Sequence, residues 1–266
     1  MPKVSIITPV YNRPDFLKEA VESIQKQSFA DWEHIIIDDG SDNPGTQKAL
    51  QEISQKPKVS IFRTENRGLG AARNFGILKS SGDYIVTLDD DDIWHMDFIM
   101  KALSVFDSNK KVGAVSSWMQ CFGAYKSLKK PEGGGIKNFL VHNNCAHAMF
   151  RKDCWELCGK YEENKFFQPY TDWDLWLRIT ARGYSVSIIP EVLFFYRVHE
   201  QSSMLKDAEE KHIELFRFLI EKNKDIYKAN LADALCILEK KLVDTRKGLT
   251  FRNYISSKIK KILKGN

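Results

Sequence analysis

The sequence lacks the long apolar stretches that would carry a chain through a membrane. No run in its 266 residues approaches the ~20 apolar residues that a membrane-spanning helix needs. The N-terminus reads Met1-Pro2-Lys3 and passes directly into a strand pattern, so no secretory signal is visible. We therefore expect a cytoplasmic protein, whose contact with a membrane, if it has one, is peripheral on the inner face.

Paired cysteines are also missing. The five cysteines are odd in number and contain no Cys-x-x-Cys pair, which disfavours a disulfide framework and predicts reduced thiols. A zinc cluster built from His142, Cys145, His147, Cys154 and Cys158 is an alternative, but their spacing fits no standard finger. Buried thiols are the commoner outcome for such residues.

Internal repeats and low-complexity segments are absent too. A length of 266 residues fits one α/β domain of ordinary size with an appendage. The hydrophobic content of 43% and charged content of 28% are ordinary for a globular protein. The net charge of +5 is modest but unevenly placed, because the chain from Lys247 onward has six Lys or Arg residues and no acid. That tail suggests an anionic surface as partner.

Short β-rich runs alternate with helical patterns over the first 118 residues. This alternation predicts a Rossmann-like, mostly parallel central sheet flanked by helices on both faces. Residues 119–145 lose the pattern and include three consecutive glycines, which predicts a flexible or lid-like loop, and the chain after 205 reads as helices only. The predicted strands are 4–8, 32–37, 59–62, 84–88 and 112–117, and the predicted helices are 14–28, 45–54, 70–79 and 96–106.

Polar, glycine-containing or acidic loops follow each of the first four predicted strands. In open α/β sheets, ligands bind at the carboxyl ends of the strands, so four such loops at one edge predict a site. The fourth loop is Asp89-Asp90-Asp91-Asp92. Neighbouring carboxylates repel one another, and a Mg²⁺ or Mn²⁺ ion, which prefers oxygen ligands, converts that repulsion into a site that also suits phosphates. The other three loops are 9–12, 38–41 and 66–70.

Together, the motifs in and after these loops resemble the signatures of family 2 glycosyltransferases. The ordered set covers roughly the first 200 residues, and its order makes the resemblance specific although each motif alone is weak. The motifs are VSIITPVYN at 4–12, IDDGS at 37–41, NRGLGAARN at 66–74, GDYI at 82–85, LDDDD at 88–92, MFRK at 149–152, TDWDLWLR at 171–178 and YRVH at 196–199.

The resemblance implies a GT-A fold and inverting sugar transfer from a nucleotide-sugar donor. A UDP-sugar is the expected donor, with a dTDP-sugar less favoured, and the acceptor would be a saccharide or a lipid-linked saccharide, as in bacterial surface-polysaccharide assembly. The implied glycosyltransferase domain spans 1–204, divided into a nucleotide-sugar-binding half (1–118) and an acceptor-binding half (119–204). Residues 205–266 form a helical extension.

The same resemblance assigns roles to residues near the donor. Asp91 would be the direct ligand of Mn²⁺ or Mg²⁺, supported by Asp89 and His199, although a lone histidine such as His199 is also common as a surface or core residue. Asp92 would cap the next segment. Asp39 would accept from the base of the nucleotide, with a simple turn cap as the alternative for this motif. The expected donor-binding residues are Pro9, Tyr11, Asp39, Asn66, Gly70, Arg73 and Asp90; for Arg73 a salt bridge at the sheet edge is the alternative.

Asp172 falls where the family places its general base. The family usually has Glu-Asp here, and this chain has Thr171-Asp172, which keeps the base but removes a neighbouring acid. Thr171 and Asp174 also have the spacing of a capping box, so we assign Asp174 to the helix cap and Asp172 to chemistry.

Two other functions compete with sugar transfer. A sugar-nucleotide nucleotidyltransferase would need a glycine-rich phosphate loop with a basic residue right after the first strand, where this chain has Pro9-Val10-Tyr11-Asn12. A nucleotide- or glycan-binding module without activity is disfavoured by Asp91 and Asp172, although Thr171 keeps it open.

The basic tail carries Phe251, Ile255, Ile259 and Ile262 at helical spacing between lysines. This pattern over 249–264 is typical of a helix lying on an anionic membrane. Packing on the catalytic domain or on a second copy in a homodimer is the alternative. Nucleic acid is not expected as a partner, because few aromatic side chains interleave the basic residues.

Overall fold

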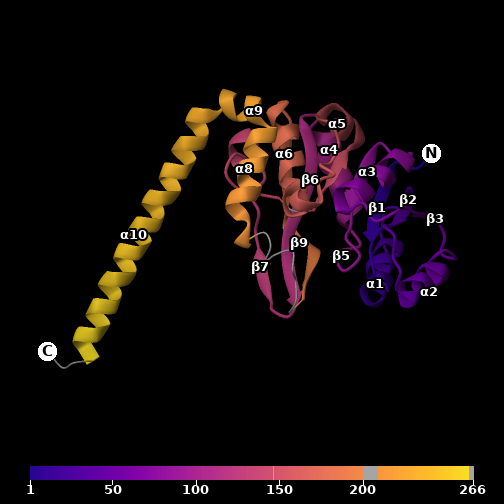
Figure 1. Cartoon of the computed structure of the whole chain (residues 1–266), viewed down its shortest axis with the longest axis horizontal. Coiled ribbons are helices and arrows are strands. Elements are labelled where there is room, and N and C mark those ends of the chain that lie inside the picture. The colour runs from indigo at the N-terminus through magenta and orange to yellow at the C-terminus, as the bar shows by residue number, and fades with distance from the viewer. Residues whose placement is uncertain (146, 200–208, 264–266) are drawn as a thin grey trace. The chain divides into compact units, whose positions relative to one another are not determined.

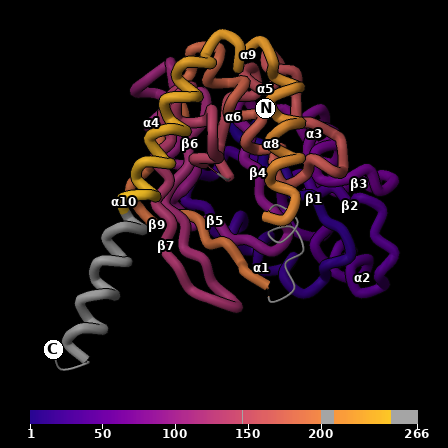
Figure 2. Tube along the Cα trace, turned by 60° about the vertical axis from the view of Figure 1, so that its left-hand side comes forward, coloured from indigo at the N-terminus to yellow at the C-terminus, as the bar shows by residue number. Residues whose placement is uncertain are grey.

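The computed structural model describes residues 1–145, 147–199 and 209–263, with only the backbone described for 248–263. Its N-terminal half is built on parallel strands that lie side by side in the order β3-β2-β1-β4 (Figures 1 and 2). Every residue of β1 is buried, as expected for a strand covered on both faces. The predicted parallel sheet is therefore confirmed in this half. The strands are β1 (Val4–Val10), β2 (Trp32–Asp38), β3 (Val59–Arg63) and β4 (Tyr84–Thr87).

Amphipathic helices cover both faces of these strands. On one face, Val10 and Ile36 pack with the apolar side chains of α1 and α2. On the other face, Gly76 brings α3 against Ile7, where an added Cβ would lie only 2.6 Å from the Ile7 side chain. These packing contacts hold the helix starts, and the loops before them, at the carboxyl edge of the sheet. The helices are α1 (Pro14–Gln25), α2 (Pro44–Ile53), α3 (Leu69–Lys79) and α4 (Phe98–Ser108).

The second half of the sheet is mixed rather than parallel. The short strand β8 pairs antiparallel with both β4 and β6, and β9 runs parallel to β6 and antiparallel to β5. The central sheet is thus less uniformly parallel than the sequence predicted, although the α/β class is confirmed. The strands are β5 (Ile93–Trp94), β6 (Val112–Gly123), β7 (Ser127–Lys129), β8 (Met149–Arg151) and β9 (Ser185–Val198).

The prediction of a flexible loop from residue 119 onward was wrong for its first part. Strand β6 continues to Gly123, and β7 pairs with it in an antiparallel hairpin. The long neighbour β9 provides hydrogen-bonding partners along the whole of β6, and such tertiary pairing stabilises a strand whose local pattern is weak. A 3₁₀ turn, η1 (Ile136–Asn138), follows.

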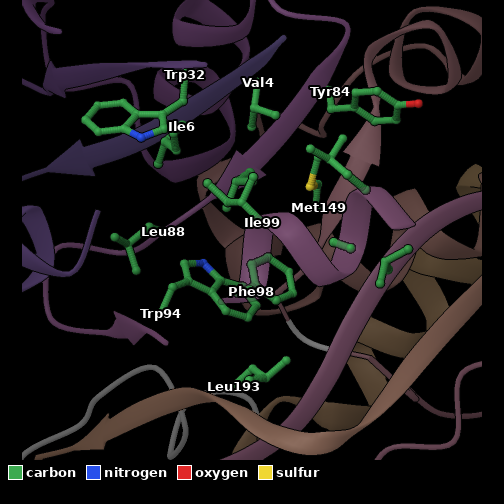
Figure 3. Packing of buried hydrophobic residues seen from close by; sticks show 14 of the residues in the cluster. Val4, Ile6, Trp32, Tyr84, Leu88, Trp94, Phe98, Ile99, Met149 and Leu193 are labelled. Carbon is green, nitrogen blue, oxygen red and sulfur yellow. The ribbon is translucent and has the colours of Figure 1, made fainter. Parts of the chain in front are cut away.

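The apolar core in Figure 3 includes Leu88 and Trp94, which lie on either side of the acidic loop in the sequence. Trp94 of β5 stacks on Phe98 of α4, with ring centroids 3.6 Å apart. The Trp94 indole N–H also donates to the carbonyl of Thr87, 3.1 Å away, at the end of β4. Both ends of the segment between Thr87 and Trp94 are therefore fixed, which positions the four aspartates.

Helices α5 (Lys152–Cys158), α6 (Thr171–Ala181) and α8 (His212–Lys222), with the 3₁₀ segment η2 (Lys165–Tyr170), complete the first compact unit, Met1–Asn223. The rings of Trp173 in α6 and Phe216 in α8 are stacked with centroids 5.5 Å apart. This packing joins α8 to the helix that carries Asp172.

The prediction that Asp174 caps α6 was wrong. Asp174 is fully buried, and its carboxylate accepts from Arg178 (2.6 Å), Lys222 (2.9 Å) and Asn223 (2.8 Å). The start of α6 has no side-chain cap; Thr171 instead donates to the carbonyl of Gln168. Asp174 therefore links α6 to the end of α8, because its buried carboxylate is the shared acceptor for Arg178, Lys222 and the Asn223 amide.

The second compact unit, Lys224–Asn266, contains α9 (Lys224–Ala229) and α10 (Leu231–Leu263). The described residues from 209 to 263 are mainly helical, as predicted, while the predicted boundary at 204 and 205 lies outside the described residues. The side chains of the basic tail, 249–264, also lie outside them, so its membrane and dimer contacts stay predictions. Across the described part of the chain, no helix has the length and apolarity to cross a bilayer.

Candidate active site

The loops that follow β1, β2 and β3 are tied together by hydrogen bonds. The backbone N–H of Asn12 donates to Ser41 Oγ (3.0 Å), and Asn12 Oδ1 accepts from the N–H groups of Asp42 and Asn43, each at 3.0 Å. Gly40 has a φ of +80°, and a Cβ there would lie 2.8 Å from the backbone nitrogen of Asn66. The loops therefore converge at one edge, as the sequence predicted.

A cavity of about 340 Å³ opens between these loops and the acidic run. Of the residues expected at the donor, Pro9, Tyr11, Asp39, Asn66 and Asp90 line it. We call this space the donor cavity. Its other lining residues are Val10, Arg13, Gly68, Leu69, Asp89 and Gln168.

Asp39 shapes the wall of the donor cavity. Its Oδ1 accepts from the N–H of Arg67 (2.9 Å) and its Oδ2 from the N–H of Gly68 (2.8 Å), so the carboxylate holds the loop that follows β3. The turn role considered for this motif belongs to Asp38, whose Oδ1 accepts from the N–H of Ser41 (2.8 Å). Asp39 is left facing the cavity.

Gly70 lies outside the lining of the donor cavity. A Cβ at Gly70 would lie 1.9 Å from the carbonyl oxygen of Glu162, so the glycine permits the close approach of α3 to that segment.

Arg73, also outside that lining, connects the acidic run to Asp172. It is fully buried, and it donates to Asp89 Oδ1 (2.8 Å) and to Asp172 Oδ1 (2.9 Å). Burial alone would lower the pKa of Arg73, but the carboxylates of Asp172 and Asp89 raise it above its usual value. The salt bridge considered for Arg73 is thus present, and it places Asp172 next to the donor cavity.

Asp91 lies between two basic side chains. Its Oδ2 is 2.9 Å from His199 Nε2 and 2.5 Å from Arg13 Nη1, and the same guanidinium is 3.6 Å from Asp90. Burial and the neighbouring Asp91 raise the pKa of Asp90 well above its ordinary value. Asp90 and Asp91 need a positive charge nearby, which Arg13 provides in this structure. The carboxylate oxygens and the imidazole of His199 are also ligands that suit a divalent cation.

Asp92 does not cap a helix, contrary to the prediction. It is fully buried, its Oδ1 accepts from the N–H of Arg197 (2.8 Å), and its Oδ2 is 3.5 Å from His147 Nε2. Asp89 Oδ2 is 3.8 Å from the same imidazole nitrogen. Burial alone would raise the pKa of Asp89, but Arg73 and His147 lower it.

The predicted metal residues therefore face two directions. Asp91 and His199 meet on one side, while Asp89 lies with Asp92 and His147 on the other. Asp89, Asp92 and His147 are also the group of acids and histidines that could hold a metal among the described residues. Among the same described residues, the alternative zinc cluster is not assembled. Cys154 and Cys158 are buried thiols, and burial raises their pKa values.

The family model of glycosyl transferase family 2 matches residues 5–170, more than half of the chain. The chain belongs to glycosyl transferase family 2. It is 40% identical over 212 residues to the putative teichuronic acid biosynthesis glycosyltransferase TuaG of Bacillus subtilis, covering 76% of this chain and 81% of TuaG. This chain also matches two other curated glycosyltransferases, and it spans 73% of the length of one and only 27% of the length of the other.

Solved structures show that this family 2 glycosyltransferase has the GT-A fold. The TarS fragment 1–349 of S. aureus in complex with UDP-GlcNAc has a TM-score of 0.65 at 16% identity, over 76% of this chain and 60% of that one. The mannosyltransferase PcManGT of Pyrobaculum calidifontis, in complex with GDP-Man and Mn²⁺, has a TM-score of 0.62 at 18% identity, over 100% of this chain and 88% of that one.

Sequence reasoning missed several residues of this glycosyltransferase's site. Gln168 and Gly68 line the donor cavity, and His147 contacts Asp89 and Asp92. A signal existed for Arg13, because a basic residue directly follows the loop after the first strand. None existed for Gln168, which reaches the cavity from the distant segment η2.

Proposed function

We propose that the protein is an inverting glycosyltransferase that moves a sugar from a nucleotide diphosphate sugar to an acceptor hydroxyl, with Asp172 as general base. One observation carries this proposal: Arg73 joins Asp172 directly to Asp89, which lines the donor cavity. A base is thereby held beside the place where a donor would be cleaved. Glycosyltransferase activity itself follows from family membership.

A UDP-sugar is the donor we propose, with a dTDP-sugar as the weaker candidate. The cavity provides Tyr11 and Pro9 as apolar walls, and Asp39 and Asn66 as polar groups that a bound nucleoside would meet. TarS, a structural neighbour, is known in complex with UDP-GlcNAc. PcManGT, another neighbour, carries GDP-Man, so base specificity depends on contacts in these loops.

We propose that Asp91 and His199, with Asp89 in support, would hold Mn²⁺ or Mg²⁺. The donor set fits, because a carboxylate oxygen of Asp91 and Nε2 of His199 lie 2.9 Å apart, and both are ligands that these cations accept. When bound, the cation supplies positive charge to the leaving diphosphate. PcManGT holds Mn²⁺, which supports a divalent cation in this fold.

In the proposed reaction, Asp172 accepts the proton of the acceptor hydroxyl as its oxygen forms a bond to the anomeric carbon. The bond between that carbon and the diphosphate breaks, and the nucleoside diphosphate leaves with the electron pair. Arg73 fixes the orientation of Asp172, because its Nη1 lies 2.9 Å from Asp172 Oδ1. Positioned base catalysis of this kind contributes about 10²–10⁴-fold to the rate.

The decisive experiment compares Asp172→Asn with wild type for donor binding and turnover. We expect UDP binding to be retained and transfer to fall by about two to four orders of magnitude. Because the acceptor is unidentified, turnover is first measured as hydrolysis of a panel of UDP-, dTDP- and GDP-sugars with Mn²⁺ or Mg²⁺. Asp153→Asn, an exposed acid outside the cavity, serves as the matched control.

Near-normal transfer by Asp172→Asn would refute its role as base. For the metal, Asp91→Ala should lose the Mn²⁺ dependence of UDP binding, and an unchanged dependence would refute Asp91 as ligand. Binding of UDP-sugars without turnover by the wild type would favour the inactive binding module. Release of pyrophosphate from a sugar phosphate and UTP would favour the nucleotidyltransferase.

The acceptor we propose is a saccharide or a lipid-linked saccharide at the cytoplasmic face of a membrane. TuaG is named for teichuronic acid biosynthesis, which supports a surface-polysaccharide role. The basic tail at 249–264 would then rest on anionic lipid. Flotation of the full chain with anionic liposomes, compared with a chain ending at Arg246, tests this contact, and equal, negligible binding of both would exclude it.

A further inference from the structure

A second cavity, also of about 340 Å³, lies between β6, β7 and the segment before β8. We call it the lysine cavity after Lys129 and Lys130, which stand on its rim. None of its lining residues is shared with the donor cavity. The lining residues are Ser116, Ser117, Met119, Lys129, Lys130, Pro131, Asn143, Asn144, Cys145, His147 and Phe194.

The lysine cavity borders the reaction centre through His147. The His147 imidazole is in contact with Phe194 inside the cavity (ring centroids 4.6 Å apart), and its Nε2 lies 3.8 Å from Asp89. Asp89 lines the donor cavity and shares Arg73 with Asp172. Asp89 therefore lines the donor cavity and also lies 3.8 Å from a residue that lines the lysine cavity.

The charges of the two cavities differ in sign. The donor cavity has Asp39, Asp89 and Asp90 on its walls, whereas the lysine cavity has no carboxylate among its lining residues. Across the residues that the structure describes, no salt bridge joins Lys129 or Lys130 to an acid. The lysine cavity thus holds two cations that a ligand could neutralise.

Further contacts shape the lysine cavity for a ring-shaped polar ligand. The Lys130 ammonium lies 4.3 Å from the centroid of the Trp118 ring, which restrains it at the rim. Asn144 is held by the N–H of Glu132, 2.9 Å from its Oδ1, and the Glu132 side chain itself is exposed. Met119 and Phe194 are the large apolar side chains of the lining.

We propose that the lysine cavity binds the acceptor, and that the acceptor carries an anionic group, a carboxylate or a phosphate, which Lys129 and Lys130 recognise. This inference rests on the proposed transferase function, because only then does a saccharide need to reach Asp172 from the side opposite the donor. It adds the chemical class of the acceptor, which neither the fold nor the family specifies. Uronic acids and sugar phosphates both satisfy it.

Binding of simple saccharides tests the proposal without a known acceptor. Titrations of ¹⁵N-labelled protein, loaded with UDP and diamagnetic Mg²⁺, would use methyl glucuronide, methyl glucoside and glucose 1-phosphate. The backbone signals of Ser116, Ser117 and Asn143 report on the cavity. We expect one or both anionic sugars to bind at least about tenfold more tightly than the neutral one, as charge-assisted hydrogen bonds allow.

The double variant Lys129→Gln/Lys130→Gln should lose that preference while methyl glucoside binding stays unchanged. Lys126→Gln, an exposed lysine of the same hairpin outside the lining, is the matched control and should behave as wild type. Preference for glucuronide over glucose 1-phosphate would identify a carboxylate, and the reverse a phosphate.

Equal binding of charged and neutral sugars, or an unchanged preference in the double variant, would overturn the proposal. Intact UDP binding and donor hydrolysis in the double variant show that it is folded and that the donor side functions. Failure of donor hydrolysis in the wild type would instead count against the proposed transferase, so the two failures are distinguishable.

Discussion

Replacing Asp174 with asparagine should destabilise the protein, because two cations would then lack their buried partner. Asp174 accepts hydrogen bonds from Arg178 and Lys222, and an asparagine would turn an N–H₂ donor or a neutral oxygen toward them. Breaking a buried ion pair by removing one partner costs about 3–5 kcal/mol. Lys222 keeps a second partner, Glu162, at 2.7 Å, so we expect the lower end of that range.

A loss of about 3 kcal/mol corresponds to a fall in Tm of about 6–12 °C for a domain of this size. Burial alone would raise the pKa of Asp174, but Arg178 and Lys222 lower it below its ordinary value. A lowered pKa means that the carboxylate stabilises the fold above the unfolded pKa of ~3.9 and ceases to do so as the pH falls through the folded value. The difference between wild type and variant should therefore be full at neutral pH and shrink below about pH 4.

Urea denaturation followed by circular dichroism measures both effects, at neutral pH and at about pH 3.5. The matched control is Asp107→Asn, an exposed acid 3.9 Å from Lys110, which should change the free energy of unfolding by less than about 1 kcal/mol. An Asp174→Asn variant that is as stable as this control would refute the reasoning. So would a difference from wild type that does not depend on pH.

Two further predictions concern the site and the sheet. The Arg13→Gln variant should bind Mn²⁺ about fivefold more tightly than wild type, because no guanidinium then competes for Asp91 and a half-exposed ion pair is worth about 1 kcal/mol. Electron paramagnetic resonance of unbound Mn²⁺ measures this affinity. An equal or weaker affinity in the variant would contradict the prediction. His34 is buried beside Thr8, and burial lowers its pKa to about 3. Between about pH 6.5 and pH 3 only the unfolded chain binds a proton at this histidine, so the folded protein should lose stability as the pH falls through this range. A His34→Gln variant should show a flatter decline in urea midpoints between about pH 7 and pH 4, and parallel curves for the two proteins would count against the assignment.

The parallel strands and the loops after them were predictable because their signals are local. Each apolar run of β1, β2 and β4 is followed by a polar or glycine-containing loop, and parallel pairing brings the strand ends to one edge. The sequence motifs then assigned chemistry to these loops. Asp39 and Asp90 line the donor cavity for that reason.

What the sequence could not predict depends on partners far away in the chain. Asp174 has the spacing of a helix cap, and only its contact with Lys222, 48 residues later, shows that it links two helices inside the protein. Asp92 is next to a predicted metal ligand, yet Arg197 and His147 determine its surroundings. The extension of β6 beyond 117 likewise depends on β9.

Strand β8 has a consequence for the order in which the protein is made. Its three residues, Met149–Arg151, fill the gap between β4 and β6, although both neighbours come earlier in the chain. Until a ribosome has released residue 151, the edge of β4 has no hydrogen-bonding partner, and an unpaired edge invites association with other chains. The first 118 residues therefore keep an unpaired strand edge until β8 has been synthesised.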